Sequence, residues 1–191
     1  MISAILLAAG ASRRMGRDKL GMAWRASTVL TTTLERWLAV PSIAEVVLVR
    51  RAPDENAYGS KVRVVINANP EEGMGSSLRV GALAVANEAR AVVMGLGDMP
   101  NVETATIAAL IGRWEELGEK ANAIVVPAWK QRRGHPVLFG LNYLPMLRSL
   151  GGDRGARDIL TQWASQVVLM PTQDPGVCFD IDTMRDYEGG Y

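Results

Sequence analysis

Short apolar segments alternate with amphipathic segments along most of the chain, and this alternation limits the possible folds more than any other feature. Apolar runs of strand length lie at Ile2–Ala8, Ala44–Val49, Val62–Ile66, Ala91–Leu96, Ala123–Pro127 and Val167–Met170. Apolar residues at helical spacing predict helices at Thr28–Val40, from near Ser76 to Val85, at Thr104–Leu117 and at Asn142–Leu150. Strands separated by helices pair in parallel, with helices on both faces of the sheet. We therefore predict an α/β fold, and the length of 191 residues predicts a single domain over 1–191.

The segment after the first strand is rich in small residues and in cations. Gly10 ends the strand, and Arg13, Arg14, Arg17 and Lys19 follow it. Small side chains let backbone N–H groups approach an anion closely, and basic side chains neutralise phosphate oxygens. The segment therefore predicts a polyphosphate site. The alternative is a plain turn with solvated cations, because neither GxGxxG nor GxxxxGK followed by Ser or Thr is present.

A second segment rich in small residues precedes the helix expected near Ser76. Gly73 and Gly75 separate Pro70 from Ser76 and Ser77. Amides and hydroxyls at a helix N-terminus bind ribose or phosphate oxygens, so the segment is a candidate nucleotide contact. The alternative is that a serine simply caps the helix.

Asp98 follows the strand-like run at 91–96, within the sequence Gly-Asp-Met-Pro. An aspartate at the carboxyl end of a central parallel strand lies where open α/β sheets bind their ligands. Mg²⁺ prefers one or two carboxylates together with substrate phosphates, so we predict that Asp98 is a metal ligand. The alternative is a cap for the helix that starts near Glu103, although Asn101 or Val102 is better placed for that role.

Asp180 and Asp182 lie two residues apart in an extended segment, and so share a face. This arrangement offers a second metal ligand opposite Asp98. The alternative is that Asp182 caps the last helix, which we expect at Thr183–Tyr187.

Basic residues and the only histidine gather in the second half of the chain. His135 precedes an apolar strand, and a lone histidine is more often a structural hydrogen-bonding residue than a catalyst. Arg154 and Arg157 lie in a glycine-rich turn, where they bind an anionic acceptor or pair with Asp153 and Asp158 at the surface.

Composition narrows the class of protein. The formal charge of +1 argues against a dedicated nucleic-acid binder. Cys178 is the only cysteine, so an internal disulfide and a cysteine-built metal site are excluded. No apolar run approaches the roughly 18 residues of a membrane span, and no secretory signal is recognisable after Met1. We expect a cytoplasmic protein that does not bind a membrane.

Six segments together resemble one family. In order they are LAAGASRRMG from Leu7, GMGSSL from Gly73, GDMP from Gly97, RGHP from Arg133, GDRGAR from Gly152 and DIDT from Asp180. This set is similar to the MobA-like nucleotidyltransferases of the MocA type, the molybdenum cofactor cytidylyltransferases. The resemblance implies a Rossmann-like three-layer sandwich of the nucleotide-diphospho-sugar transferase type, with a mostly parallel central sheet.

The resemblance also implies roles for individual residues. Arg14, Lys19 and Asp98 are the expected catalytic residues, and Asp98 and Asp182 the expected ligands of Mg²⁺, with Asp180 behind them. The expected nucleotide contacts are Leu7, Ala8, Ala9, Gly10, Ser12, Arg14, Lys19, Gly75, Ser76 and Ser77. The expected acceptor contacts are Arg133, His135, Arg154 and Arg157. Arg13 and Arg17 are expected to lie at the surface or to make secondary contacts.

Such enzymes transfer a nucleoside monophosphate from an NTP to a phosphorylated acceptor and release pyrophosphate. Ala9 stands where guanylyltransferase relatives usually have glycine, so we expect CTP as the donor and molybdopterin or its molybdenum-loaded form as the acceptor, with a molybdoenzyme or chaperone as a possible partner. The alternatives are a guanylyltransferase, another NTP transferase that uses a sugar phosphate or a small phosphorylated acid, and a non-catalytic molybdenum-cofactor chaperone.

Overall fold

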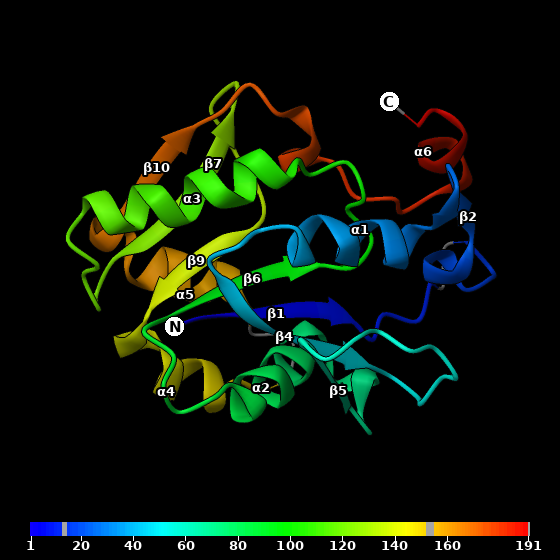
Figure 1. Cartoon of the computed structure of the whole chain (residues 1–191), viewed down its shortest axis with the longest axis horizontal. Helices are drawn as coiled ribbons and strands as arrows, with labels where there is room; N and C mark the ends of the chain where they lie inside the picture. The colour runs from blue at the N-terminus through cyan, green and yellow to red at the C-terminus, as the bar shows by residue number, and fades with distance from the viewer. Residues whose placement is uncertain (13–14, 152–154, 191) are drawn as a thin grey trace.

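A mixed sheet of eight strands forms the central layer of the protein (Figure 1). The computed structural model describes residues 1–12, 15–151 and 155–190. The strands that these residues contribute to the sheet are β1 (Ile2–Ala8), β4 (Ile43–Arg50), β5 (Val62–Ile66), β6 (Ala91–Leu96), β7 (Ile124–Trp129), β8 (Arg132–Arg133), β9 (Val137–Gly140) and β10 (Val167–Pro171). Their order is β10-β7-β9-β6-β1-β4-β5, and β8 pairs with β7. A separate hairpin consists of β2 (Ala23–Trp24) and β3 (Ser27–Thr28).

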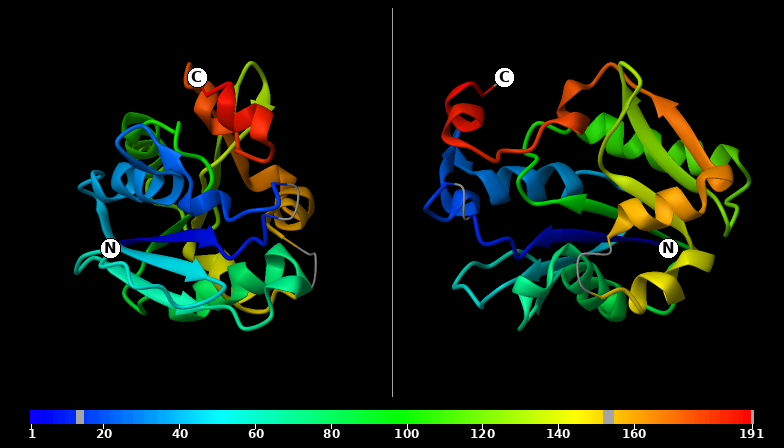
Figure 2. Two further views of the ribbon diagram at one scale, coloured as in Figure 1. Left: turned by 90° about the vertical axis from the view of Figure 1, so that its right-hand side faces the viewer. Right: turned by 180° about the vertical axis from the view of Figure 1, so that it is seen from behind.

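Helices cover both faces of this sheet (Figure 2). The α-helices are α1 (Val29–Leu38), α2 (Met74–Ala84), α3 (Thr104–Glu116), α4 (Leu144–Arg148), α5 (Ala156–Gln162) and α6 (Met184–Glu188). The 3-10 helices are η1 (Lys19–Gly21), η2 (Pro70–Glu72), η3 (Leu141–Tyr143), η4 (Ala164–Gln166) and η5 (Pro175–Cys178). The buried side chains of α1 and α3 join one hydrophobic layer, and those of α2, α4 and α5 join the other. The predicted three-layer α/β fold is therefore confirmed. Within the described ranges, no helix is long and apolar enough to cross a bilayer.

β1 lies in the interior of the sheet, and all seven of its residues are buried. Successive side chains of a strand point to opposite faces. Ala4 and Leu6 accordingly pack in the layer of α1 and α3, while Ile5 and Leu7 pack in the layer of α2. This two-sided burial explains why the run is apolar throughout rather than alternating.

The strand order reverses beside β1. β4 pairs in parallel with one edge of β1, β6 pairs in parallel with the other, and β5 extends the sheet beyond β4. Open α/β sheets bind ligands at the carboxyl ends of their strands where the order reverses in this way. The topology therefore predicts a ligand site in the loops that follow β1 and β6.

β9 departs from the expected parallel pairing, because it runs antiparallel to both β6 and β7. The chain reaches it through a tight turn at Lys130 and Gln131, both with positive φ, and through β8, with no helix between. A short return of this kind produces antiparallel neighbours, whereas a helix is usual between parallel ones. The helix predicted at 142–150 is also interrupted, since η3 and α4 divide that segment.

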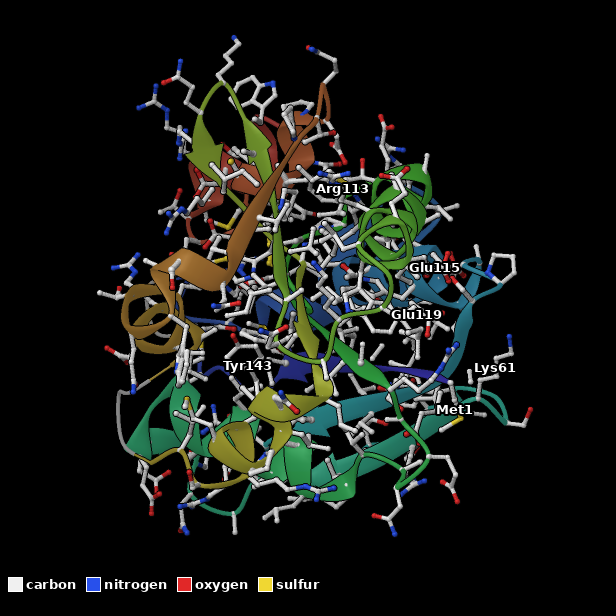
Figure 3. The ribbon with its side chains drawn as sticks, turned by 90° about the vertical axis from the view of Figure 1, so that its left-hand side faces the viewer. Met1, Lys61, Arg113, Glu115, Glu119 and Tyr143 are labelled. Atoms are coloured by element: carbon white, nitrogen blue, oxygen red, sulfur yellow. The ribbon has the colours of Figure 1, made fainter. Side chains whose placement is uncertain are left out.

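Tyr143 anchors the connection from β9 to α4, at the end of the sheet that carries Met1 (Figure 3). The Tyr143 hydroxyl donates to the Asn122 carbonyl oxygen at 2.9 Å. Its ring packs edge-on against the rings of Phe139 and Trp163. This end is therefore held by side-chain packing, and the carboxyl ends of β1 and β6 lie at the opposite edge of the sheet.

Gly95 in β6 allows Trp37 of α1 to pack directly on the sheet, because a Cβ atom at this position would overlap the indole ring. We expect Gly95→Ala to lower the free energy of unfolding by about 1–3 kcal/mol, the usual cost of overpacking. Gly112→Ala in α3 is the matched control, because a Cβ atom there meets nothing within 4 Å. Removal of this helical glycine is expected to raise the free energy of unfolding by about 0.5–1 kcal/mol. Urea denaturation measures both, and equal effects would contradict the packing argument.

Candidate active site

A pocket of about 420 Å³ opens at the carboxyl ends of β1 and β6. The pocket is lined by nine of the residues that were predicted to bind the nucleotide or the metal ion: Leu7, Ala8, Ala9, Gly10, Ser12, Lys19, Ser77, Asp98 and Asp182. The remaining lining residues are Leu20, Pro70, Gly73, Met74, Leu96 and Asp180. The loop after β1, the turn after β5 and the segment before α6 thus meet at one cavity, although they are far apart in the sequence.

Lys19 is the cation that the described residues contribute to this pocket. It begins η1 and is buried, and its backbone N–H donates to Ser12 Oγ at 3.2 Å. Its Nζ lies 2.6 Å from Asp98 Oδ2 and 2.9 Å from Asp182 Oδ1. One ammonium group therefore bridges two carboxylates that come from distant parts of the chain.

The segment between η5 and α6, which we call the carboxylate segment (residues 179–183), crosses the end of β6. The Ile181 N–H donates to the Asp98 carbonyl oxygen at 3.0 Å, and the Ile181 side chain is fully buried. Asp180 and Asp182 flank this anchored residue, so both are held beside the pocket. Asp98 itself is positioned by Gly97, whose N–H extends the hydrogen bonding between β1 and β6 at 2.8 Å.

Burial and charge shift the ionisation of both partners. Burial raises the pKa of Asp98 above its ordinary value, the Lys19 ammonium opposes this rise, and the charge of Asp180 adds to it. Burial alone lowers the pKa of Lys19, but the contacts with Asp98 and Asp182 outweigh it, so its pKa lies above the ordinary value. Lys19 is therefore protonated at neutral pH.

The carboxylates also fit a divalent metal ion. Asp98, Asp180 and Asp182 each offer one oxygen, and these three atoms lie within 4.8 Å of one another. Asp98 Oδ1 is buried and has no hydrogen-bond partner among the described residues. A buried acceptor without a partner is unfavourable, and a hard cation such as Mg²⁺ or Mn²⁺ binds oxygen ligands of this kind. The donor set therefore suits such an ion.

The opposite wall of the pocket is formed by the turn after β5 and the start of α2. Gly73, with φ of +109°, is the N-cap of α2, so the helix begins before Ser76 and the alternative of a serine N-cap is wrong. Ser77 lines the pocket, whereas Gly75 and Ser76 are not among the described lining residues. Ser76 is fully buried, and its hydroxyl donates to the carbonyl oxygen of Gly73 at 2.9 Å.

The capping alternatives for the two aspartates are also wrong. The N-cap of α3 is Glu103, whose N–H donates to Asp174 Oδ2 at 2.9 Å. The N-cap of α6 is Thr183, whose hydroxyl oxygen accepts the N–H of Asp186 at 3.2 Å. Neither Asp98 nor Asp182 has a capping role.

The expected acceptor residues are more dispersed. His135 lies near the carboxylate segment. Burial lowers its pKa below the ordinary value, and the negative charge of Asp180 opposes this decrease. Its Nδ1 is buried without a hydrogen-bond partner in the part of the chain that the structure describes. Arg133 in β8 and Arg157 in α5 are exposed. None of these three residues lines the pocket.

Two of the expected site residues, Arg14 and Arg154, lie outside the described residues. The surface pairing considered for Arg157 is absent from the described part of the chain, where Asp158 instead accepts the N–H of Gly155 at 2.8 Å. Asp180 was expected behind the metal ligands, whereas the structure groups its oxygen with theirs. The two-residue spacing of Asp180 and Asp182, which places them on one face, is the sequence pattern that indicates this grouping.

Comparison with known proteins agrees with this architecture. Residues 4–167 match the family model of the MobA-like NTP transferase domain. The chain is 31% identical over 192 residues to nicotine blue oxidoreductase of Paenarthrobacter nicotinovorans, covering 96% of this chain and 93% of that protein. It is 29% identical over 187 residues to the molybdenum cofactor cytidylyltransferase of Escherichia coli, covering 97% and 93%.

Solved structures show the same fold. Rv0371c of Mycobacterium tuberculosis in complex with manganese superposes with a TM-score of 0.75 and 28% identity, over 98% of this chain and 96% of that chain. A nucleotidyl transferase from Methanothermobacter superposes with a TM-score of 0.80 and 22% identity, over 99% and 95%. The sheet and its helices thus have the nucleotide-diphospho-sugar transferase fold.

Removal of the Lys19 charge is expected to destabilise the protein in a pH-dependent way. The side chains of Lys19 and Asp98 are only 11% and 16% exposed, so Lys19→Met leaves a buried carboxylate without its counter-ion. We expect a loss of about 3 kcal/mol near pH 7. The folded-state pKa of Asp98, already raised, rises further in this variant, so the loss shrinks as the pH falls through that pKa and Asp98 takes up a proton.

Urea denaturation at several pH values between neutrality and pH 4 measures this loss. Lys61→Met is the matched control, because Lys61 is exposed at the edge of the molecule (Figure 3). Its effect is expected to stay within about 0.5 kcal/mol. A Lys19→Met loss that is independent of pH would contradict the role given to Asp98.

Proposed function

The chain belongs to the MobA-like NTP transferase domain family, and from this premise we propose that it transfers CMP from CTP to the phosphate of molybdopterin or its molybdenum-loaded form, releasing pyrophosphate. The observation that carries the proposal is the cluster of one ammonium group and three carboxylates beside a pocket at the strand ends. Such a cluster suits a reaction between two anionic substrates. We further propose that residues 1–191 form one nucleotidyltransferase domain that acts in the cytoplasm, with a molybdoenzyme or chaperone as partner.

The pocket is proposed to hold the nucleotide. Its small residues allow the backbone to approach a base and phosphates closely. The proposed nucleotide contacts are Leu7, Ala8, Ala9, Gly10, Ser12, Arg14, Lys19, Gly75, Ser76 and Ser77. Ser76 is proposed to contribute through its backbone only, because its side chain is fully buried and its hydroxyl donates to the carbonyl oxygen of Gly73. Arg133, His135, Arg154 and Arg157 are proposed to face the acceptor. His135 lies near Asp180 of the carboxylate segment.

The proposed reaction needs orientation and charge stabilisation rather than a strong base, because an acceptor phosphate is already an anionic nucleophile. An acceptor oxygen forms a bond to the α-phosphorus of CTP, and the bond to the bridging oxygen breaks, so that the electron pair leaves with pyrophosphate. Lys19, which is protonated, donates hydrogen bonds to phosphate oxygens as charge develops. Asp98, Asp180 and Asp182 would hold Mg²⁺, which supplies charge neutralisation at the phosphates when bound.

Three findings favour the proposed substrates and metal ion. The Escherichia coli relative that aligns over 97% of this chain is named a molybdenum cofactor cytidylyltransferase, and the manganese complex of Rv0371c supports a divalent metal in this fold. Ala9 stands where guanylyltransferase relatives usually have glycine, and this resemblance favours CTP over GTP.

Pyrophosphate release tests the proposal directly. The protein is assayed with molybdopterin, Mg²⁺ and each of the four NTPs, and we expect CTP to give the highest kcat/KM. Asp98→Asn and Asp182→Asn are expected to lower kcat/KM by about 100-fold or more, the scale on which lost electrostatic stabilisation acts. Glu115→Gln is the matched control, because Glu115 is exposed on α3 (Figure 3) and should leave the rate unchanged.

Each alternative has its own signature in this assay. A higher kcat/KM with GTP would reject the cytidylyl assignment. Release with a sugar phosphate but not with molybdopterin would reject the acceptor. Tight binding of the cofactor without any turnover would favour a chaperone. Oxidation or reduction of nicotine blue without pyrophosphate release would favour the chemistry in the name of the Paenarthrobacter relative.

A further inference from the structure

Asn67 is a buried polar residue directly behind the pocket wall, at the end of β5. It is 2% exposed, and it does not line the pocket. Its backbone N–H donates to the carbonyl oxygen of Arg50 at 2.8 Å, which extends the pairing of β4 with β5 by one residue. Its place in the sequence does not single it out, because an asparagine after a strand usually marks a turn.

The hydrogen bonds of Asn67 determine how its amide is oriented. The backbone N–H of Asn69 lies 3.0 Å from Asn67 Oδ1. A backbone N–H can only donate, so the atom that faces it must be the amide oxygen. The amide nitrogen then faces α2, where it lies 2.8 Å from Ser76 Oγ and 3.0 Å from Ser77 Oγ. Both hydrogens of the amide are therefore donated to serine oxygens.

The two serine hydroxyls differ in whether the protein offers an acceptor for their hydrogen. Ser76 accepts from Asn67 and donates to the carbonyl oxygen of Gly73 at 2.9 Å, so it is satisfied inside the protein. Ser77 accepts from Asn67 in the same way, but the described residues offer no acceptor for its own hydroxyl hydrogen. Ser77 is also the serine that lines the pocket. Its hydrogen is thus left for a ligand.

We propose that Asn67 is a specificity-determining positioning residue, which fixes the Ser77 hydroxyl as a hydrogen-bond donor toward the nucleotide. This inference rests on the proposed function, because it takes the pocket as the nucleotide site. The ligand atom opposite Ser77 is then an acceptor, such as the carbonyl oxygen of a pyrimidine, and an N–H group at that place is disfavoured. Buried polar groups discriminate strongly when the wrong ligand leaves them unpaired.

Asn67→Asp reverses this polarity and so provides the test. A carboxylate only accepts, so the Ser77 hydroxyl must donate to it and presents lone pairs to the pocket. We expect CTP binding, measured by calorimetry with Mg²⁺, to weaken by about tenfold or more. In a Ser77→Ala background the same change should have little effect on binding, since no hydroxyl is left to reverse. In a Ser76→Ala background Asn67→Asp should still weaken CTP binding to the full extent, because the Ser76 side chain does not line the pocket.

Asn67→Ala covers the case in which a buried carboxylate at this position prevents folding. It removes the donor without adding a charge, and we expect CTP affinity to fall by about threefold, again only when Ser77 is present. Steady-state kinetics should show the change in KM for the nucleotide, with kcat nearly unchanged. Thermal melting of every variant reports on the fold separately, because Asn67 also supports the turn at Asn69.

The outcomes separate this inference from the proposed function. Binding losses that are the same with and without Ser77 would overturn the inference, because Asn67 would then act only by supporting the turn. Failure of the unaltered protein to bind any of the four NTPs would overturn the proposed function, and with it the assignment of a nucleotide opposite Ser77. Coupling to Ser77 but not to Ser76 is the result that supports the inference.

Discussion

The contact of one buried ammonium group with two carboxylates is the interaction on which the site depends. Lys19 follows β1, Asp98 follows β6, and Asp182 comes from the carboxylate segment, so the contact joins three distant parts of the chain. Three carboxylates this close together repel one another unless a cation lies among them. The hydrogen bond from Ile181 to the Asp98 carbonyl oxygen sets the backbone positions, and the ammonium makes the resulting concentration of negative charge tolerable.

The fold was predictable where each segment carried its own signal. The apolar run of β1 and the spacing of Leu30, Leu34 and Trp37 in α1 are local patterns, and the structure confirms both elements. The antiparallel direction of β9 was missed, because it depends on the tight turn at Lys130 and Gln131. Neither residue is a usual one for positive φ, so the turn has no recognisable sequence signature.

Part of the site was predictable, because several of its residues directly follow strands that the sequence identifies. Gly10, Lys19 and Asp98 follow strand ends, and parallel strands bring such residues to one edge of the sheet, where the structure finds them. Their chemical roles stay predictions. Asn67 was not foreseen, because its hydrogen bonds to α2 are contacts across the fold. Asp180 was expected near the metal ligands but behind them, whereas its oxygen is grouped with theirs. A pattern of residue types shows which groups are available, but not which atom of an amide faces a hydroxyl.

The construction of the pocket has an evolutionary consequence. Its charged centre is held together by the ion pairs of Lys19 with Asp98 and Asp182, whereas the wall with Ser77 comes from the connection after β5. Connections tolerate substitution and insertion far better than interior strands. A lineage with this architecture can therefore exchange one substrate for another while it conserves the charged centre. Relatives about 30% identical to this chain carry names as different as an oxidoreductase and a cytidylyltransferase, as such divergence would produce.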